Sequence, residues 1–239
     1  MRFITSSLLL VWALSMQAQE APRQNGWPAT CQPVTIRSAK DSSLQRAYFH
    51  QSAKPGPQPL VVSLHSWSGG YDQQDELLPQ VLAEDYHYIH PDFRGPNTNP
   101  AAGGSDLVLA DLDDAVDYAM RHANVDPTQI HVVGNSGGGY ATLLMYMRSR
   151  HRLASCSAFV PISNLESWYY ESLGRRQKYY RDLLAVTASP DSLHFNGAEA
   201  RRRSPLFMTT PLATRRHTRL RLAAGVHDGY TGSVPITHT

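Results

Sequence analysis

A serine at the centre of a glycine-rich turn is the residue of this chain best placed to do chemistry. Gly-Asn-Ser-Gly-Gly forms a G-x-S-x-G pattern centred on Ser136, between an apolar run at 129–133 and a helical pattern at 140–147. A tight turn from strand to helix lifts a serine hydroxyl above the sheet edge, and Gly134 and Gly138 avoid collisions there. The pattern predicts Ser136 as a nucleophile, and the alternative is an ordinary loop at the start of a helix.

The rest of the chain alternates between apolar runs typical of strands and patterns typical of helices. The first two runs, at 33–36 and 45–50, suggest a hairpin. This alternation predicts an α/β fold, a mostly parallel, doubly wound sheet with helices on both faces. In such sheets the chemistry gathers at the carboxyl ends of the strands. The other predicted strands are 60–64, 88–90, 129–133 and 156–162, and the predicted helices are 73–85, one beginning at Asp106, and 140–147.

Two groups of charged residues are interpreted as solvated surface. In the second predicted helix, apolar residues recur at spacings of three and four, and Asp113, Asp114 and Asp117 lie largely off that face. These acids therefore favour a solvated helix face over a metal site. The arginines at 201–203 and 215–216 are interpreted as a solvated helix end and loop.

Length, composition and the first residues limit the classes of protein. The chain has 239 residues, of which 41% are hydrophobic, so one catalytic domain over 19–239 is expected. Residues 1–18 resemble a secretory signal peptide, with Arg2 before a short apolar core and Ala18 at its end. That core is too short to cross a bilayer, so we expect a secreted or periplasmic protein with no membrane span. The net charge of +2 argues against nucleic acid as a partner.

The two cysteines, Cys31 and Cys156, leave two possibilities open. An oxidising compartment would permit a disulfide between them, provided that the two Cα atoms approach closely enough. Cys156 begins an apolar run, however, where a free cysteine is often a small core residue. No CxxC or HExxH spacing occurs in the chain, so neither a metal nor a cofactor is expected.

The segment 166–211 is expected to form helical pieces inserted between two strands. Its position suits a cap over the site, where aromatic rings could hold a substrate, and plain packing onto the main domain is the alternative. Its clustered aromatic residues are Trp168, Tyr169, Tyr170, Tyr179 and Tyr180.

Several short motifs occur together in the order that one fold family shows. They are His65-Ser-Trp-Ser-Gly-Gly70, Pro91-Asp-Phe-Arg-Gly95, Val125-Asp-Pro127, Gly134-Asn-Ser-Gly-Gly138 and Gly225-Val-His-Asp228. As a set they resemble the α/β-hydrolase fold, and most closely the catalytic domains of prolyl-oligopeptidase-like serine hydrolases and of secreted carbohydrate and acyl esterases. The resemblance extends over about residues 33–239, and it is specific to the fold and far less specific to the substrate.

The resemblance implies a role for each matching residue. Ser136 would attack an acyl carbonyl, and the backbone N–H groups of Gly137 and Trp67 would hold the resulting oxyanion. Family members usually carry glycine after the histidine of the oxyanion loop, whereas this chain has Ser66, so Ser66 is the alternative to Trp67. His65 would be a structural part of that loop.

The acid and the base of the expected triad fall near the end of the chain. Asp228 matches the family's acid, which orients and stabilises a histidine, and its alternative is a turn aspartate. A triad histidine should follow on a later loop, but only His238 comes after Asp228, and it resembles the start of a helix. The side chain of His227, which precedes Asp228 directly in the sequence, would point away from the Asp228 side chain. We expect either a piece of a longer reading frame that ends before the last strand, which we favour, or a protein that has lost the base.

Three functions remain open from the sequence. The first is a secreted serine hydrolase that cleaves a carboxylic ester, such as an acyl group on a polysaccharide, through an acyl-enzyme. The second is a serine peptidase of the prolyl-oligopeptidase type, although such peptidases usually carry a large gating domain ahead of the catalytic one. The third is a non-catalytic protein that binds a ligand with the aromatic residues at 168–180.

Overall fold

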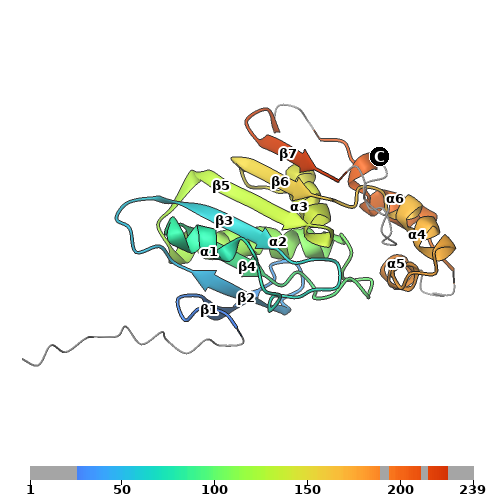
Figure 1. Cartoon of the computed structure of the whole chain (residues 1–239), viewed down its shortest axis with the longest axis horizontal. Helices are drawn as coiled ribbons and strands as arrows, with labels where there is room; N and C mark the ends of the chain where they lie inside the picture. The colour runs from blue at the N-terminus through green and yellow to red at the C-terminus, as the bar shows by residue number, and fades with distance from the viewer. Residues whose placement is uncertain (1–25, 189–193, 211–214, 226–239) are drawn as a thin grey trace, which may run out of the picture.

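One β-sheet forms the centre of the computed structural model, which describes residues 26–188, 194–210 and 215–225 (Figure 1). Within these residues the strands are β1 (Gln32–Arg37), β2 (Leu44–His50), β3 (Gln58–Leu64), β4 (His87–Pro91), β5 (Val125–Asn135), β6 (Ser155–Phe159) and β7 (Arg219–Ala223). They lie in the order β1-β2-β4-β3-β5-β6-β7. The β1–β2 and β2–β4 pairs are antiparallel, and every pair from β4 to β7 is parallel.

Helices cover both faces of this sheet. Helix α1 (Leu78–Ala83) covers one face, and α2 (Asp106–His122) and α3 (Gly137–Arg148) cover the other. The described residues also contain α4 (Leu165–Gly174), α5 (Tyr179–Thr187) and α6 (Gly197–Arg203), followed by a 3-10 helix, η1 (Pro205–Phe207). On β3, Leu60 and Val62 face the apolar cluster beneath α2 and α3, whereas Val61 faces the cluster beneath α1. Successive strand residues point to opposite faces, so an apolar strand needs cover on both. The predicted doubly wound α/β fold is confirmed.

The first helix is shorter than the sequence predicts. The predicted hairpin is present as β1 and β2, but the helix predicted over 73–85 is confined to α1. Pro79 lies in the first turn of α1, and the Asp75 carboxylate accepts the Leu77 N–H at 3.0 Å. Proline favours a helix start, and an aspartate bonded to nearby backbone favours a turn. Residues 73–77 therefore form a turn and not a helix.

Two of the acids expected to be solvated are buried. Asp113 and Asp114 on α2 are 4% and 5% exposed, so the interpretation of a solvated face is wrong for both. Asp113 accepts hydrogen bonds from the Ser149 hydroxyl at 2.6 Å and the Arg150 N–H at 3.2 Å. Asp114 accepts the Ala39 N–H at 2.7 Å. Because the β1–β2 turn and the end of α3 cover this side of α2, the carboxylates satisfy backbone and hydroxyl donors there.

Replacing Asp113 by alanine should lower the free energy of unfolding by about 2 kcal/mol, because the Ser149 hydroxyl and the Arg150 N–H would lose their acceptor. The matched control is Asp117→Ala on the same helix. The Asp117 side chain is 33% exposed and pairs with Arg150, so its loss should cost less than about 1 kcal/mol. Urea unfolding measures both variants, and equal losses would contradict the prediction.

Two of the arginines expected to be solvated are also buried. Arg203 and Arg215 are each 6% exposed, so the interpretation is wrong for them. Arg215 donates to the carbonyl oxygen of Ser149 at 2.8 Å, and Arg203 donates to that of Ala102 at 2.8 Å. A guanidinium group carries five N–H donors, so carbonyl oxygens of neighbouring segments can replace water around it.

The cysteines do not form a disulfide. Cys31 and Cys156 are both free and buried, Cys31 in the cluster beneath α1 and Cys156 in the cluster beneath α2 and α3. The two clusters lie on opposite faces of the sheet, which keeps the two sulfur atoms apart. Burial raises the pKa of Cys31 to about 11 and that of Cys156 to about 12.

Helices α4, α5 and α6 gather beyond one end of the sheet, the end toward which β3 and β5 point (Figure 1). We call residues 164–208 the helical segment. Asn164 caps α4 by accepting the N–H groups of Glu166 and Ser167, and Asn196 caps α6 by accepting that of Glu199. The helical segment is therefore built from helices with their own start signals, placed at the carboxyl edge of the strands.

Three predictions fall on residues that the structure does not describe. They are the signal peptide at 1–18, the role of Asp228, and the ending of the chain before a last strand. Among the helices of the described residues, none has the length and apolar character needed to cross a bilayer.

Candidate active site

Ser136 lies at the junction between β5 and α3 with an unusual backbone conformation. Its φ of 57° and ψ of −116° fall in a region that residues with a Cβ atom rarely adopt. The Ser136 N–H donates to the Phe159 carbonyl on β6 at 2.9 Å, and its own carbonyl accepts the Tyr140 N–H of α3. The bend is thus held from both sides, and the half-buried serine stands at the carboxyl edge of the sheet.

The glycines around Ser136 lie where backbone segments meet. A Cβ atom on Gly134 would be 2.3 Å from the backbone of Gly138, and one on Gly138 would be 2.1 Å from the carbonyl oxygen of Leu64. Real Cβ contacts are never this short, so both positions require glycine unless the backbone moves. The close approach packs the first turn of α3 against the end of β3.

The backbone of Trp67 passes beside the first residue of α3. A Cβ atom on Gly137 would lie 2.2 Å from the Trp67 nitrogen, so the two backbone N–H groups belong to adjoining segments. Gly137 is the first residue of α3, and an N–H group in the first turn of a helix has no acceptor within that helix. Ser66, the alternative, donates its N–H to Gln73 Oε1 at 3.0 Å. The geometry therefore favours Trp67 over Ser66 as the donor that could face an oxyanion with Gly137.

His65 fixes the direction of the peptide that carries the Trp67 N–H. Its ring is fully buried and stacks on Phe93 with centroids 3.8 Å apart and planes 3° apart. Its Nδ1 lies 2.9 Å from the carbonyl oxygen of Ser66. A carbonyl only accepts, so Nδ1 carries a proton and donates it. Since that carbonyl and the Trp67 N–H belong to one peptide unit, His65 orients both.

The helical segment covers the side chain of Trp67. The indole packs edge to face on Trp168 with centroids 4.9 Å apart, and its Nε1 donates to Asp182 Oδ2 on α5 at 3.2 Å. Burial raises the pKa of Asp182, since it disfavours the charged carboxylate. Trp168 and Tyr169 are buried in this contact cluster, whereas Tyr170 is 59% exposed. Trp168 therefore packs against the main domain, whereas Tyr169 stacks on Phe195 within the helical segment.

Most of the chain matches a known protein family. Residues 59–231, which run from β3 to beyond β7, match the model of the alpha/beta hydrolase fold. The chain belongs to the α/β-hydrolase family. The Salmonella typhimurium protein YfhR, whose name calls it uncharacterized, is 24% identical over 115 residues. That alignment covers 47% of this chain and only 39% of YfhR.

Solved structures with this hydrolase fold include several peptidase domains. The acylaminoacyl peptidase of Pyrococcus horikoshii matches with a TM-score of 0.61 and 17% identity, covering 86% of this chain and 39% of that one. A puromycin hydrolase matches with a TM-score of 0.60 and 13% identity over 81% and 35% of the two chains. Prolyl oligopeptidase B from Galerina marginata gives 0.57 and 11% over 82% and 33%. At these identities the likeness establishes the fold, and it confirms the resemblance to prolyl-oligopeptidase-like catalytic domains.

A cavity of about 430 Å³ opens beside the Ser136 bend. It lies at the carboxyl ends of β3, β5 and β6, and Gly134 and Asn135 form part of its wall. Most of its polar groups come from the turn before α1. The polar lining residues are Ser63, Ser66, Gln73, Gln74, Asp75, Glu76, His90 and Asn135. Ser136, Gly137 and Trp67 are not among its lining residues, so the cavity adjoins the Ser136 bend through Gly134 and Asn135.

One wall of the cavity contains a buried histidine, His90. It is 1% exposed, and its Nε2 has no hydrogen-bond partner among the described residues. Burial, together with the nearby His65, lowers the pKa of His90 to about 4. The neighbouring Tyr88 hydroxyl donates to Asp75 at 2.5 Å. The folded protein therefore holds His90 as a neutral ring.

The burial of His90 predicts a loss of stability in mild acid. In an unfolded chain the pKa of histidine is 6.5, whereas in the folded protein the pKa of His90 is about 4. The unfolded state thus binds more protons in this window, and the free energy of unfolding falls as the pH drops through it. His90→Gln should lose less stability than the wild type between pH 6.5 and 4.5 in urea unfolding. Parallel pH curves would contradict this.

The remaining members of the expected triad fall outside the described residues. Asp228, His227 and His238 all belong to residues 226–239. Among the described residues, no three His, Cys, Asp or Glu side chains gather closely enough to hold a metal ion.

Three residues that contact the loop after β3 were missed from the sequence. Gln73 accepts the Ser66 N–H, Asp182 accepts the Trp67 indole N–H, and Asn97 donates to the Trp67 carbonyl oxygen. Asn97 lies in a stretch whose composition indicates only a loop, and no motif includes it. Such contacts depend on loops that meet in space, and no local pattern predicts them.

Proposed function

We propose that this protein is a serine hydrolase that works through an acyl-enzyme. The Ser136 hydroxyl oxygen attacks the carbonyl carbon of the substrate, and the Trp67 and Gly137 N–H groups stabilise the negative charge that develops on the carbonyl oxygen. The bond to the leaving group then breaks, and water hydrolyses the acyl-serine. As the family resemblance implies, a histidine would take the proton from the Ser136 hydroxyl and deliver it to the leaving group, and Asp228 would orient and stabilise that histidine.

The conformation of Ser136 is the observation that carries this proposal. A serine held at φ 57° and ψ −116° stores strain that the surrounding fold must offset. An ordinary helix start needs no such strain. The bend also brings Gly137 against the Trp67 nitrogen, which provides two donors beside one hydroxyl. Strain of this kind, located next to paired donors, is expected of a nucleophile.

Amide bonds of peptides are the substrate class that we propose first. Support comes from the solved structures with this fold, which include acylaminoacyl and prolyl peptidases. The chain spans 39% or less of those peptidases and of YfhR, so the activity of the whole protein is part of the proposal.

Carbohydrate esters are the second candidate, and the lining of the cavity favours them. Amide and carboxylate groups line the cavity that adjoins the Ser136 bend. They belong to Gln73, Gln74, Asp75, Glu76 and Asn135. Groups of this kind accept and donate hydrogen bonds to the many hydroxyls of a sugar. A polysaccharide or a small sugar ester would then be the substrate.

Fluorophosphonate labelling tests whether Ser136 is an activated nucleophile. The wild-type protein should gain the mass of one adduct, located on the peptide that contains Ser136, and Ser136→Ala should gain none. An unlabelled wild type would overturn the proposal and favour a non-catalytic ligand-binding protein.

Paired assays separate the two substrate classes. An N-acylated prolyl amide and p-nitrophenyl acetate are given to the same preparation, with Ser136→Ala as the blank. A peptidase should cleave both substrates, because esters are the easier reaction for an acyl-enzyme. Ester turnover without any amide cleavage would reject the peptidase in favour of the esterase.

Export to the periplasm or the exterior remains part of the proposal, on the basis of the signal-like residues 1–18. N-terminal sequencing of protein from the cell fractions tests it. Intact Met1 on cytoplasmic protein would reject export.

A further inference from the structure

A buried asparagine holds the carbonyl group of Trp67. Asn97 lies in the loop between β4 and α2 and is 2% exposed. Its backbone N–H and its side-chain Nδ2 both donate to the Trp67 carbonyl oxygen, each at 3.0 Å. Its side-chain Oδ1 accepts the Gly103 N–H at 2.7 Å. Asn97 thus connects Trp67 to Gly103, near the other end of the loop between β4 and α2.

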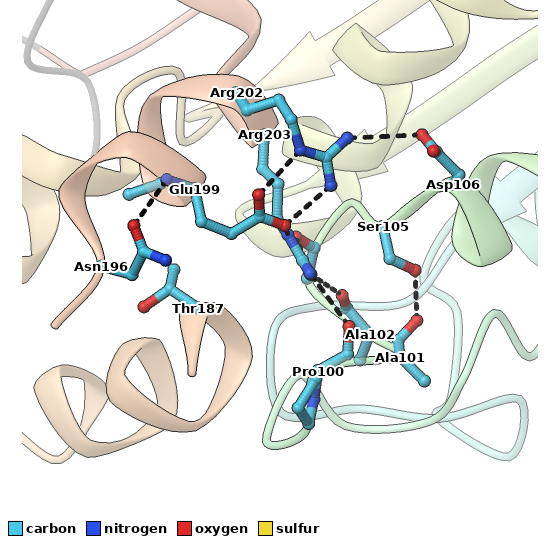
Figure 2. A network of polar contacts seen from close by, with 12 residues as sticks. Pro100, Ala101, Ala102, Ser105, Asp106, Thr187, Asn196, Glu199, Arg202 and Arg203 are labelled. Atoms are coloured by element: carbon cyan, nitrogen blue, oxygen red, sulfur yellow. Dashed lines mark hydrogen bonds and ion pairs between the residues drawn. The ribbon is translucent and has the colours of Figure 1, made fainter. Parts of the chain in front are cut away.

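The same loop is held from the other side by Arg203 of α6. The Arg203 guanidinium donates to the Ala102 carbonyl at 2.8 Å and to the Pro100 carbonyl at 3.1 Å, and its Nε donates to Glu199 at 2.6 Å. Figure 2 shows Arg203 reaching from the helical segment to these backbone oxygens. A guanidinium that bridges two carbonyls and a carboxylate fixes both partners in direction as well as in distance.

The loop has no room to shift between these two anchors. A Cβ atom on Gly104 would lie 1.9 Å from the Tyr140 hydroxyl, and one on Gly103 would lie 2.2 Å from Val186 of α5. The Tyr140 hydroxyl is within hydrogen-bond distance of the Gly103 carbonyl at 3.1 Å and of the Arg203 carbonyl at 2.9 Å. The contacts therefore run without a gap from α6 through the loop to Trp67.

We propose that Asn97 is a positioning residue for the Trp67 N–H, and that Arg203 of the helical segment keeps Asn97 in place. The inference rests on the proposed function, in which that N–H holds the oxyanion. His65 fixes the peptide before the Trp67 Cα atom, and Asn97 fixes the peptide after it. Oxyanion donors act through geometry set before the reaction, so freeing one of the two peptides weakens the transition state more than the bound substrate.

Asn97→Asp is the sharpest test, because it keeps the size of the side chain and the acceptor for the Gly103 N–H while removing the Nδ2 donor. We expect kcat for p-nitrophenyl acetate to fall about 10- to 100-fold, with KM changed less than about twofold. The rate of fluorophosphonate labelling should fall in parallel, since phosphonylation also develops charge on an oxygen. Asn97→Ala should show the same split between kcat and KM.

Arg203→Met and Arg202→Met form a matched pair on one helix. Arg202 also binds Glu199, at 2.7 Å, but its other contact is Asp106 and not the loop. Figure 2 shows the two arginines diverging from Glu199. We expect Arg203→Met to lower kcat about tenfold and Arg202→Met to leave it within about twofold. Arg203→Lys, which can reach a single carbonyl, should recover part of the loss.

The outcomes separate this inference from the proposed function. If the wild type is not labelled, the proposed function fails and this inference fails with it. If the wild type is labelled and Asn97→Asp reacts at the wild-type rate, only the positioning role is overturned. The positioning role is also overturned if the variant changes KM and not kcat. It is overturned as well if kcat per folded molecule is unchanged, so that the lower activity reflects only a smaller amount of folded protein, measured by thermal unfolding.

Discussion

Replacing Ser136 by glycine should make the protein more stable and catalytically inert. At φ 57° and ψ −116° a side chain costs about 1 to 3 kcal/mol, and glycine avoids that cost while losing about 0.5 to 1 kcal/mol through its freer unfolded state. The net gain in the free energy of unfolding should be about 1 kcal/mol. Loss of the nucleophile should lower kcat by about a millionfold.

Ser136→Ala is the control for this prediction. Alanine removes the same hydroxyl but keeps the Cβ atom, so it should lose the same activity with no gain in stability. Urea unfolding and p-nitrophenyl acetate turnover measure both variants side by side. A Ser136→Gly protein no more stable than Ser136→Ala would show that the bend is not strained.

Gly138→Ala should destabilise the protein by about 3 kcal/mol or more and remove its activity. The new Cβ atom would be 2.1 Å from the Leu64 carbonyl oxygen and 3.0 Å from that of His65. Backbone cannot rotate away as a side chain can, so either α3 or the end of β3 must move. That movement would also displace the loop after β3, which carries the Trp67 N–H.

Gly174→Ala serves as the matched control for Gly138→Ala. Gly174 ends α4, and a Cβ atom there would meet nothing within 4 Å. The same chemical change should therefore leave stability unchanged or raise it by up to about 1 kcal/mol. Guanidinium unfolding of both variants decides the matter, and a comparable loss in the two would show that the contacts around Gly138 are not responsible.

The parts of the fold that local sequence encodes could be predicted. The alternation of apolar runs predicts the sheet, because a strand such as β3 must be apolar on both faces when helices cover both. The turn at Ser136 has a sequence signature because Gly134 lies against the backbone of Gly138, a contact between residues that are close in the sequence. The order of motifs then predicts the family that the comparison establishes.

The contacts that reach across the fold could not be predicted in this way. Asp113 and Arg203 are charged residues with ordinary helical spacing, and only the approach of other segments buries them. Asn97 contacts a residue thirty positions away through a loop with no periodicity. The sequence leaves the Ser66 N–H as an alternative to the Trp67 N–H as the second oxyanion donor. In the structure the Gln73 side chain accepts the Ser66 N–H, which favours Trp67.

Neither Cys31 nor Cys156 takes part in a disulfide bond, so the described fold does not depend on an oxidising environment. Cys31 and Cys156 lie in separate clusters on opposite faces of the sheet, and burial keeps each sulfur protonated at neutral pH. Oxidants and alkylating reagents act on thiolates, so both sulfurs should be inert while the protein is folded. Dithiothreitol should therefore leave the stability of the folded protein unchanged, because neither of these cysteines takes part in a disulfide bond.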